Sequence, residues 1–366
     1  MSRRCRIAAA AGGALLAAAL LTPAGASAHG LVGRQDLPIP RWLFAWGAAV
    51  VLVASFVALG TLWAKPRLQA VRERRVAGLP RALEVVLGLL GIAAFAAVVY
   101  AGFAGTQTPT ANLAPTAIYV VLWVGVPVLS LLFGDVFRAV NPWRAVARGV
   151  GWAAKRVAGR GGLPEPLPYP ERLGRWPAAL GLLAFAWVEL VWAQRDDPSS
   201  LAVLALVYAA VQLLGMALYG VEPWTRRGDA FSAYFSLVAR MSPLRWQRRG
   251  MWVRPVLGGV PSLSPVPGTV ALLCVLIGTT SFDGLTQGTL WNDVAPDLQA
   301  FFGDLGLNQD RAIEAAFTVG MLVCVLGVAA LYRLGVEGVR TVGAGRPARE
   351  LAGAFVHSLV PIALAY

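Results

Sequence analysis

Histidine and cysteine are scarce in this chain of 366 residues, which contains two of the former and three of the latter. Two histidines cannot build a histidine-rich metal centre, and the sequence lacks the G-x-S-x-G, H-E-x-x-H and P-loop patterns. Cys5 lies near the amino terminus, whereas Cys274 and Cys324 lie in apolar segments, where a thiol acts as a small apolar side chain. The scarcity excludes a disulfide framework and leaves no catalytic or metal site defined by a motif.

Charged residues are also few, at 14% of the chain against about 25% in soluble domains. Hydrophobic residues make up 57% and the mean hydropathy is +0.62, which indicates a membrane-embedded chain rather than two soluble domains. The net charge of +13 does not indicate nucleic-acid binding, because the basic residues lie in short segments between apolar runs. Composition therefore favours an all-α fold, a polytopic transmembrane helix bundle.

The segment 201–227 shows the design that recurs along the chain. About twenty residues, interrupted only by Gln212, run without charge to Gly220 and lead into Arg226 and Arg227. At a rise of about 1.5 Å per residue, roughly 20 apolar residues cross a hydrocarbon core of roughly 30 Å. By this criterion the sequence predicts seven full spans, at about residues 42–63, 82–103, 116–133, 177–193, 201–220, 266–282 and 312–334.

The two ends of the chain carry separate expectations. Residues 1–28 are typical of a signal peptide, or of an uncleaved anchor, and residues 29–366 form the predicted transmembrane helical domain. Cleavage would expose the amine of His29, which could chelate copper together with its ring, but no second histidine lies nearby and no metal site is predicted. An eighth span begins near Leu351, and we expect it to be truncated at Tyr366, with a re-entrant segment as the alternative.

Lysine and arginine are sorted between alternate loops. Of the 32, the leader holds three, 25 lie near 64–81, 134–176, 221–265 and 335–350 (with Arg333 assigned to the last), and four lie in the remaining segments. Positively charged loops stay in the cytoplasm, so these four segments are predicted cytoplasmic and the acidic loop near 283–311 is predicted outside. We therefore expect a multi-pass protein of the bacterial inner membrane, with the mature amino terminus outside and the lipid bilayer as its partner.

Three predicted spans end alike on the cytoplasmic side, where Asp135, Glu222 and Glu337 each follow closely after a glycine. One interpretation is a repeated helix exit, in which glycine ends the helix and later residues anchor at the headgroups. The other is a ring of carboxylates paired with loop arginines. The sequence Gly-Asp-Val-Phe at 134–137 also resembles Gly-Asp-Ala-Phe at 228–231, a hint of internal duplication.

Few polar side chains fall within or near the apolar spans, where a charge costs roughly 2.5–3.5 kcal/mol. Glu189, Asp283 and Glu314 lie near outer ends of spans, from which they could also reach the surface, and Gln212 lies in the middle of span five. His357 lies about 12 Å into the bilayer if its segment is helical. His357 has two interpretations: a proton-linked or ligand-binding role, or a hydrogen bond between helices.

Five stretches of sequence together resemble a known family: AHGLVGRQDLPIP, GDVFRAVNPW, YGVEPWTRRGDAF, TTSFDGL and FVHSLVPIALAY. The chain from Ala28 onward is similar to bacterial polytopic membrane proteins commonly labelled fenitrothion hydrolase. The family pattern continues past the last of these stretches. The resemblance implies hydrolysis of an organophosphate ester, and it brings no set of catalytic residues that can be carried onto this sequence.

Two classes of function remain open at this stage. As a membrane hydrolase, the protein would use Asp283, Glu314 and Glu189 on apolar esters that arrive from the bilayer. As a transporter, or as a subunit of a membrane complex without catalytic activity, it would use Gln212, Glu222 and His357 as a polar pathway or as contacts between helices. The sequence names no cofactor and no protein partner, and an apolar small molecule is the substrate class that it favours.

Overall fold

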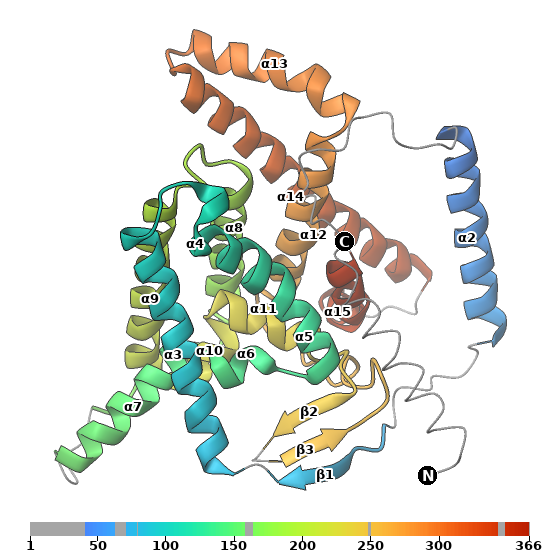
Figure 1. Cartoon of the computed structure of the whole chain (residues 1–366). Coiled ribbons are helices and arrows are strands. Elements are labelled where there is room, and N and C mark those ends of the chain that lie inside the picture. The colour runs from blue at the N-terminus through green and yellow to red at the C-terminus, as the bar shows by residue number, and fades with distance from the viewer. Residues whose placement is uncertain are drawn as a thin grey trace. The chain divides into compact units, whose positions relative to one another are not determined.

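The computed structural model describes residues 41–62, 71–78, 80–157, 164–247, 250–342 and 348–365 (Figure 1). The predicted signal peptide and His29 lie outside the described residues. The chain divides into two units, Met1–Pro66 and Arg67–Tyr366. In the first unit the described part is one helix, α2 (Arg41–Leu62), which corresponds to the first predicted span. All that follows concerns the second unit.

The second unit is mostly helical, which confirms the helix bundle, and five of its helical segments are long and apolar enough to cross a membrane. Two further apolar helices are shorter, and the structure by itself does not establish seven full crossings. The five long segments are α3 (Arg81–Ala104), Leu113–Phe133, α9 (Pro198–Tyr219), α12 (Thr269–Thr286) and α14 (Gln309–Val342). The shorter ones are α8 (Trp176–Leu190) and α15 (Ala348–Ala365).

The segment Leu113–Phe133 changes its helical winding along its length. It begins with α4 (Leu113–Pro115), continues as the π-helix η2 (Thr116–Gly125) and ends as α5 (Val126–Phe133). Pro127 has no N–H to donate and clashes with an ordinary helical turn before it, so widened winding ahead of it is physically reasonable. The backbone N–H of Val126 accordingly donates to the oxygen of Val121, five residues back.

A buried helix occupies part of the segment 221–265 that was predicted as a cytoplasmic loop. After α10 (Val221–Arg227), the chain forms α11 (Ala230–Val238), whose Phe235 and Leu237 are fully buried against α5 and α8. A helix within this segment was not predicted. Nine residues make a helix of about 14 Å, half of what a crossing needs, so a criterion based on span length passes over it.

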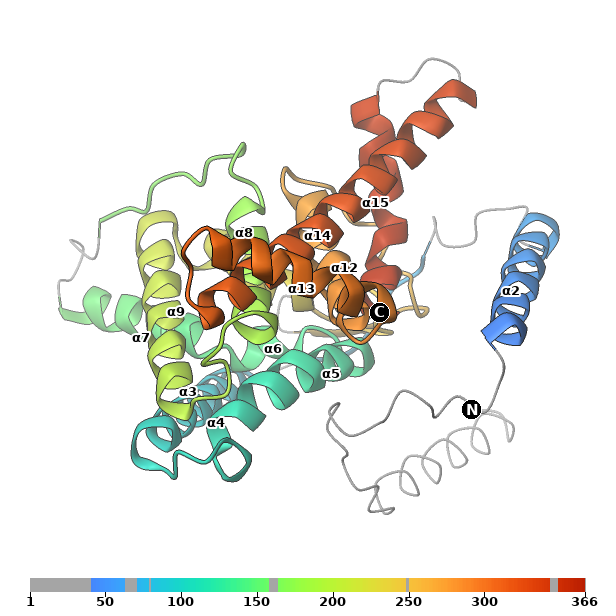
Figure 2. The same ribbon diagram turned by 90° about the horizontal axis from the view of Figure 1, so that it is seen from above.

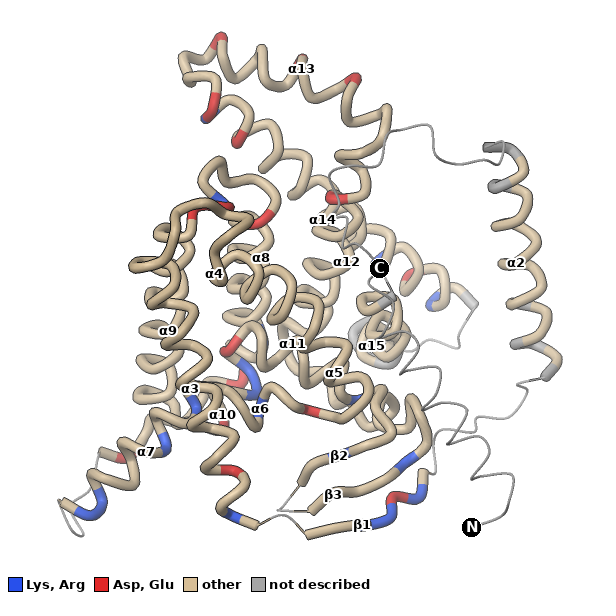
Figure 3. The backbone as a smooth tube through the Cα atoms, in the orientation of Figure 1, with Lys and Arg blue, Asp and Glu red and all other residues tan. Residues whose placement is uncertain are grey.

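The acidic segment near 283–311 likewise contains a helix, α13 (Thr289–Asp304), which the sequence analysis missed. Its Trp291 packs edge-on against Phe282 of α12 and Phe317 of α14, with ring centroids 5.1 Å apart in both pairs. In Figure 3 acidic residues mark α13 and the start of α14, whereas lysine and arginine gather around α7, α10 and the strands. A view turned by 90° shows α13 and α14 still side by side (Figure 2).

A small antiparallel sheet is the exception to the all-α prediction. Its strands β1 (Arg74–Gly78), β3 (Gly250–Val253) and β2 (Leu244–Gln247) lie in that order. Beside the sheet, Glu73 forms an ion pair with Arg245 at 2.6 Å. Strands of four or five residues leave no readable periodicity, and β1 pairs with β3, which lies far from it in the sequence. The sheet joins two of the segments that were predicted to share one side of the membrane.

Close contact between α3 and the chain after α5 depends on Gly91, because a Cβ there would overlap the carbonyl oxygen of Val140. Gly91→Ala should destabilise the protein by about 1–3 kcal/mol, since a backbone carbonyl cannot move aside cheaply. Gly327→Ala is the matched control in α14, where a Cβ meets nothing within 4 Å and alanine favours the helix. Thermal unfolding in detergent measures both; equal melting temperatures for the two variants would contradict this packing.

Candidate functional site

An apolar cavity of about 720 Å³ lies among α3, η2, α8, α9 and α11. A volume of this order suits a small organic molecule, and sites for such molecules are mostly apolar with a few placed polar groups. Eight aromatic side chains contribute to its wall: Phe95, Tyr119, Phe137, Trp143, Phe185, Tyr208, Trp224 and Phe231. Several of these rings also contact one another, Phe185 against Phe231 and Trp143 against Tyr208, with centroids 5.1 and 5.3 Å apart. The wall is therefore largely aromatic and suited to a ring-bearing ligand.

Gln212 is a polar group at this cavity and is only 3% exposed. Its Oε1 accepts a hydrogen bond of 2.9 Å from Nε1 of Trp224. An indole N–H can only donate, so this bond fixes which end of the amide is oxygen and leaves the NH2 group as the other end. Among the described residues the NH2 group makes no hydrogen bond, and it is not one of the fully buried polar atoms that lack a partner, so it stays accessible as a donor at the cavity.

Asp229 holds the wall of the cavity from behind, and its side chain is fully buried. It caps α11 by accepting from the backbone N–H of Ser232, as aspartate commonly does at a helix start. Four side-chain donors complete its shell: Ser232 Oγ at 2.7 Å, Trp143 Nε1 at 2.7 Å, Tyr208 Oη at 2.8 Å and Asn141 Nδ2 at 3.0 Å. Two of these donors, Trp143 and Tyr208, line the cavity, so Asp229 sets their orientation.

The repeated Gly-Asp pattern corresponds to the same local structure at both places. Asp135 caps α6 (Val136–Val140) through the N–H of Arg138 at 3.2 Å, as Asp229 caps α11 through Ser232. The repeat is visible in the sequence, but Asp229 was not among the predicted site residues. The signal was present in the repeat, whereas the four side-chain donors come mostly from residues that are far away in sequence.

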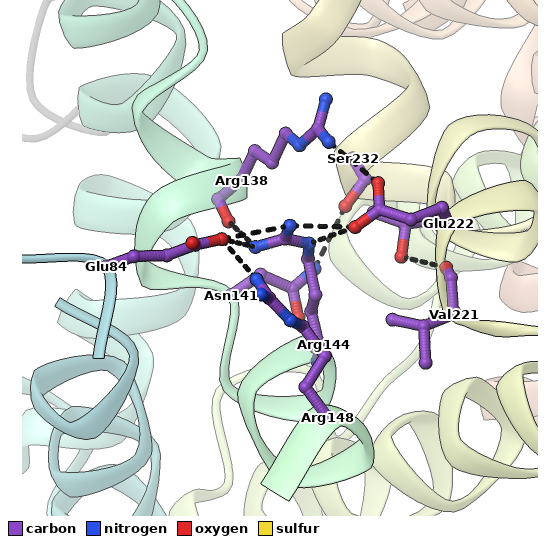
Figure 4. A network of polar contacts seen from close by, with 9 residues as sticks. Glu84, Arg138, Asn141, Arg144, Arg148, Val221, Glu222 and Ser232 are labelled. Atoms are coloured by element: carbon purple, nitrogen blue, oxygen red, sulfur yellow. Dashed lines mark hydrogen bonds and ion pairs between the residues drawn. The ribbon is translucent and has the colours of Figure 1, made fainter. Parts of the chain in front are cut away.

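Glu222 lies in an ion-pair network that Figure 4 shows. Its carboxylate binds Arg138 at 2.7 Å and Arg144 at 2.7 Å, and Arg144 reaches on to Glu84 at 3.3 Å, while Arg148 also pairs with Glu84. The network ties α3, α6, α7 (Pro142–Val157) and α10 together. Burial raises the pKa of the Glu222 carboxyl, but the guanidinium groups of Arg138 and Arg144 outweigh it, so that the pKa lies below its usual value.

Of the three carboxylates in the proposed ring, two lie near the same loop arginine and the third does not. Glu222 pairs with loop arginines, as that interpretation expects, and Asp135 meets the backbone of Arg138, one of the same arginines. Glu337 instead pairs with Arg340 of its own helix at 2.9 Å, and this pair is exposed. Burial outweighs the nearby arginines at Asp135 and raises the pKa of its carboxyl.

The three candidate catalytic carboxylates lie near the matching ends of α8, α12 and α14. Oε1 of Glu314 accepts from the backbone N–H of Ala193 at 3.0 Å, just beyond α8. Glu189 and Asp283 are close enough to repel each other electrostatically. Glu189 and Glu314 are half-buried and Asp283 is exposed. The structure thus gathers these residues at one end of three neighbouring helices.

The three candidates for a polar pathway make separate contacts. Gln212 binds Trp224, Glu222 binds the loop arginines, and the Nε2 of His357 lies 3.1 Å from the carbonyl oxygen of Leu263. Gln212 therefore joins α9 to α10, the next helix in the chain, and His357 joins α15 to the segment before α12. These contacts do not link the three residues into one chain of hydrogen bonds within the described residues.

Within the part of the chain that the structure describes, no group of three or more His, Cys, Asp or Glu residues is arranged to hold a metal ion. Comparison with family models, with curated proteins and with solved structures gives no match to this chain. The geometry therefore defines a helical membrane-type protein with an apolar, aromatic cavity as its candidate site.

The two Gly-Asp repeats allow a matched comparison. Asp229→Ala should destabilise the protein by about 3 kcal/mol or more, because several buried donors lose their acceptor at about 1–3 kcal/mol each. Asp135→Ala should cost about 1 kcal/mol, the value of one helix cap. Denaturant or thermal unfolding in detergent measures both variants, and equal losses would show that the donor shell of Asp229 contributes nothing.

The lowered pKa of Glu222 predicts a dependence of stability on pH. Its ionised form is favoured by folding, so its contribution is complete above the unfolded pKa, near 4.5, and is lost as the pH falls through the lower folded pKa. The difference in melting temperature between wild type and Glu222→Gln should be largest above pH about 5 and should shrink below pH about 4. Glu337→Gln, which breaks an exposed pair, should show little difference at any pH.

Proposed function

We propose that this chain is a multi-pass protein of the bacterial inner membrane that binds an apolar small molecule in the cavity among α3, η2, α8, α9 and α11. Seven full crossings, a cleaved or retained leader and an outer mature amino terminus complete the proposal. The sorting of lysine and arginine supports it. Contacts in the structure support it as well. The sheet joins the segments 64–81 and 221–265, and the Glu222 network joins the segments 134–176 and 221–265, all of which are predicted to be cytoplasmic.

One observation carries the choice of ligand: the free NH2 end of Gln212 at an otherwise apolar and aromatic cavity. A molecule with a ring-bearing apolar body and one hydrogen-bond acceptor would fill the volume and satisfy this donor. Such a molecule partitions into lipid and would reach the cavity from the bilayer. The family resemblance makes an aryl organophosphate ester the first ligand to test, since its phosphoryl oxygen is the acceptor required.

Hydrolysis of that ester is the second candidate function, and the grouping of Glu189, Asp283 and Glu314 at neighbouring helix ends favours it. A carboxylate there would take a proton from water as the water oxygen attacks phosphorus and the aryl oxide leaves. The third possibility, transport along Gln212, Glu222 and His357, has less support because those residues make separate contacts.

Binding of an aryl phosphotriester to the purified protein in nanodiscs should quench the fluorescence of Trp143 and Trp224, which line the cavity. Gln212→Met should weaken this binding about tenfold, the value of one buried hydrogen bond. An aromatic hydrocarbon of similar size, which has no acceptor, should bind wild type and variant equally. If the hydrocarbon distinguishes the two proteins as strongly as the ester does, the role assigned to Gln212 is wrong.

The same preparation tests hydrolysis through release of the phenol, with and without added divalent metal. Turnover that is lost in Asp283→Asn would support the enzyme. Binding without turnover would leave a binding or transport protein, and proton-coupled flux in vesicles that is lost in His357→Ala would then identify transport. Absence of both binding and turnover would contradict the proposed function.

A further inference from the structure

Three arginines without counter-ions meet where α8 and α12 begin. They are Arg175, Arg227 and Arg240, and none of them takes part in an ion pair with any described residue. Arg175 is 8% exposed, and Arg227 and Arg240 are half-buried. Arg227 lies over the ring of Tyr169, whose hydroxyl donates to the backbone oxygen of Gly174 at 2.8 Å, next to Arg175, and the charges of Arg240 and Arg227 both act on Arg175.

Each of the three guanidinium groups meets only neutral partners. Nη1 of Arg175 donates to Oγ1 of Thr269 at 3.0 Å, and its Nε is buried without a partner. Nη1 of Arg240 donates to Oγ of Ser262 at 3.0 Å. The guanidinium of Arg227 lies over the ring of Tyr169, 5.5 Å from its centroid. A hydroxyl or a ring satisfies part of the hydrogen-bonding capacity but neutralises no charge.

The other buried arginines among the described residues have acidic partners. Arg144, at 7% exposed, binds the carboxylates of Glu222 and Glu84. Arg254, also at 7%, lies 3.6 Å from the carboxylate of Glu73. A buried charge is ordinarily kept only when a partner compensates it. The absence of an acidic partner at Arg175 is therefore a departure from the pattern of the same protein.

Two helices begin side by side at this point, which adds positive potential. The backbone N–H of Arg175 donates to the carbonyl of Pro267 at 2.7 Å, just ahead of α12. Gly268, at φ +80°, makes the approach possible, since a Cβ there would lie 2.5 Å from the backbone nitrogen of Trp176. The amino-terminal ends of α8 and α12 thus lie together, and such ends attract anions.

The charges persist at neutral pH despite their surroundings. Burial, together with Arg240 and Arg227, lowers the pKa of Arg175 to about 10, and burial also lowers the pKa of Arg240 to about 10. Both groups are therefore still protonated near pH 7. Loss of a proton therefore does not relieve the repulsion between these arginines, whereas an anion bound between them would.

We propose that Arg175, Arg227 and Arg240, with the starts of α8 and α12, form a binding site for a phosphate group. Phosphate oxygens match the fork of donors on guanidinium and accept from several groups at once. The site lies directly before the apolar helix α8. An anionic headgroup or free phosphate would present the same chemistry. The site is separate from the apolar cavity and does not depend on its ligand.

The test is the shift in melting temperature of the full chain in a neutral detergent at constant ionic strength. Short-chain phosphatidylglycerol, short-chain phosphatidylcholine and inorganic phosphate are the three probes. Wild type should be stabilised, with an affinity at least about tenfold higher than that of Arg175→Gln or Arg240→Gln. Arg172→Gln, which changes an exposed arginine in the segment before α8, is the matched control and should behave as wild type.

The variants make the outcome specific. Because Arg175→Gln removes an uncompensated charge, it should be no less stable than wild type without phosphate, while its response to phosphate is lost. If that variant fails to fold, Arg240→Gln carries the comparison. A larger shift with phosphatidylglycerol than with inorganic phosphate identifies a lipid headgroup, and the reverse identifies free phosphate. Equal shifts in wild type, Arg172→Gln and both site variants, or no shift in wild type, would overturn the proposal.

Discussion

Charge placed inside an apolar helix bundle is costly unless a partner compensates it, and this cost shapes the polar contacts of the protein. Asp229 is fully buried, and five hydrogen bonds from Ser232, Trp143, Tyr208 and Asn141 hold its carboxylate. Through these bonds one residue joins α9 and the start of α7 to α11. The wall of the cavity follows from this arrangement, because two of the donors are also its lining residues.

Three polar centres of the bundle differ in how their charges are compensated. Asp229 is held by neutral donors, Glu222 is held by two arginines, and the arginines around Arg175 face one another without an acid. The first two centres are complete within the described residues and explain how α3, α7, α10 and α11 are fixed to one another. The third is incomplete, which is why it points to a ligand and the other two do not.

The short helix α11 links the fold to the candidate site. Its nine residues turn back into the bundle after α10, so Phe231 reaches the cavity while Phe235 and Leu237 fill the core. A segment of this length gains most of its stability from packing on α8 and α5 rather than from its own helical propensity. The geometry of the cavity therefore depends on contacts between segments that are far apart in the chain.

The sequence by itself determined the helical class, the positions of the long apolar helices and the grouping of basic residues, because length and polarity are local properties that a lipid core selects directly. It also revealed the repeated Gly-Asp pattern, yet Asp135 and Asp229 have the same local signature and differ only in their neighbours. Four features could be found only from the folded structure: the burial of α11, the pairing of β1 with β3, the free amide of Gln212 and the missing acid at Arg175. Each of these depends on which side chains meet across tens of residues, and no local pattern encodes that meeting.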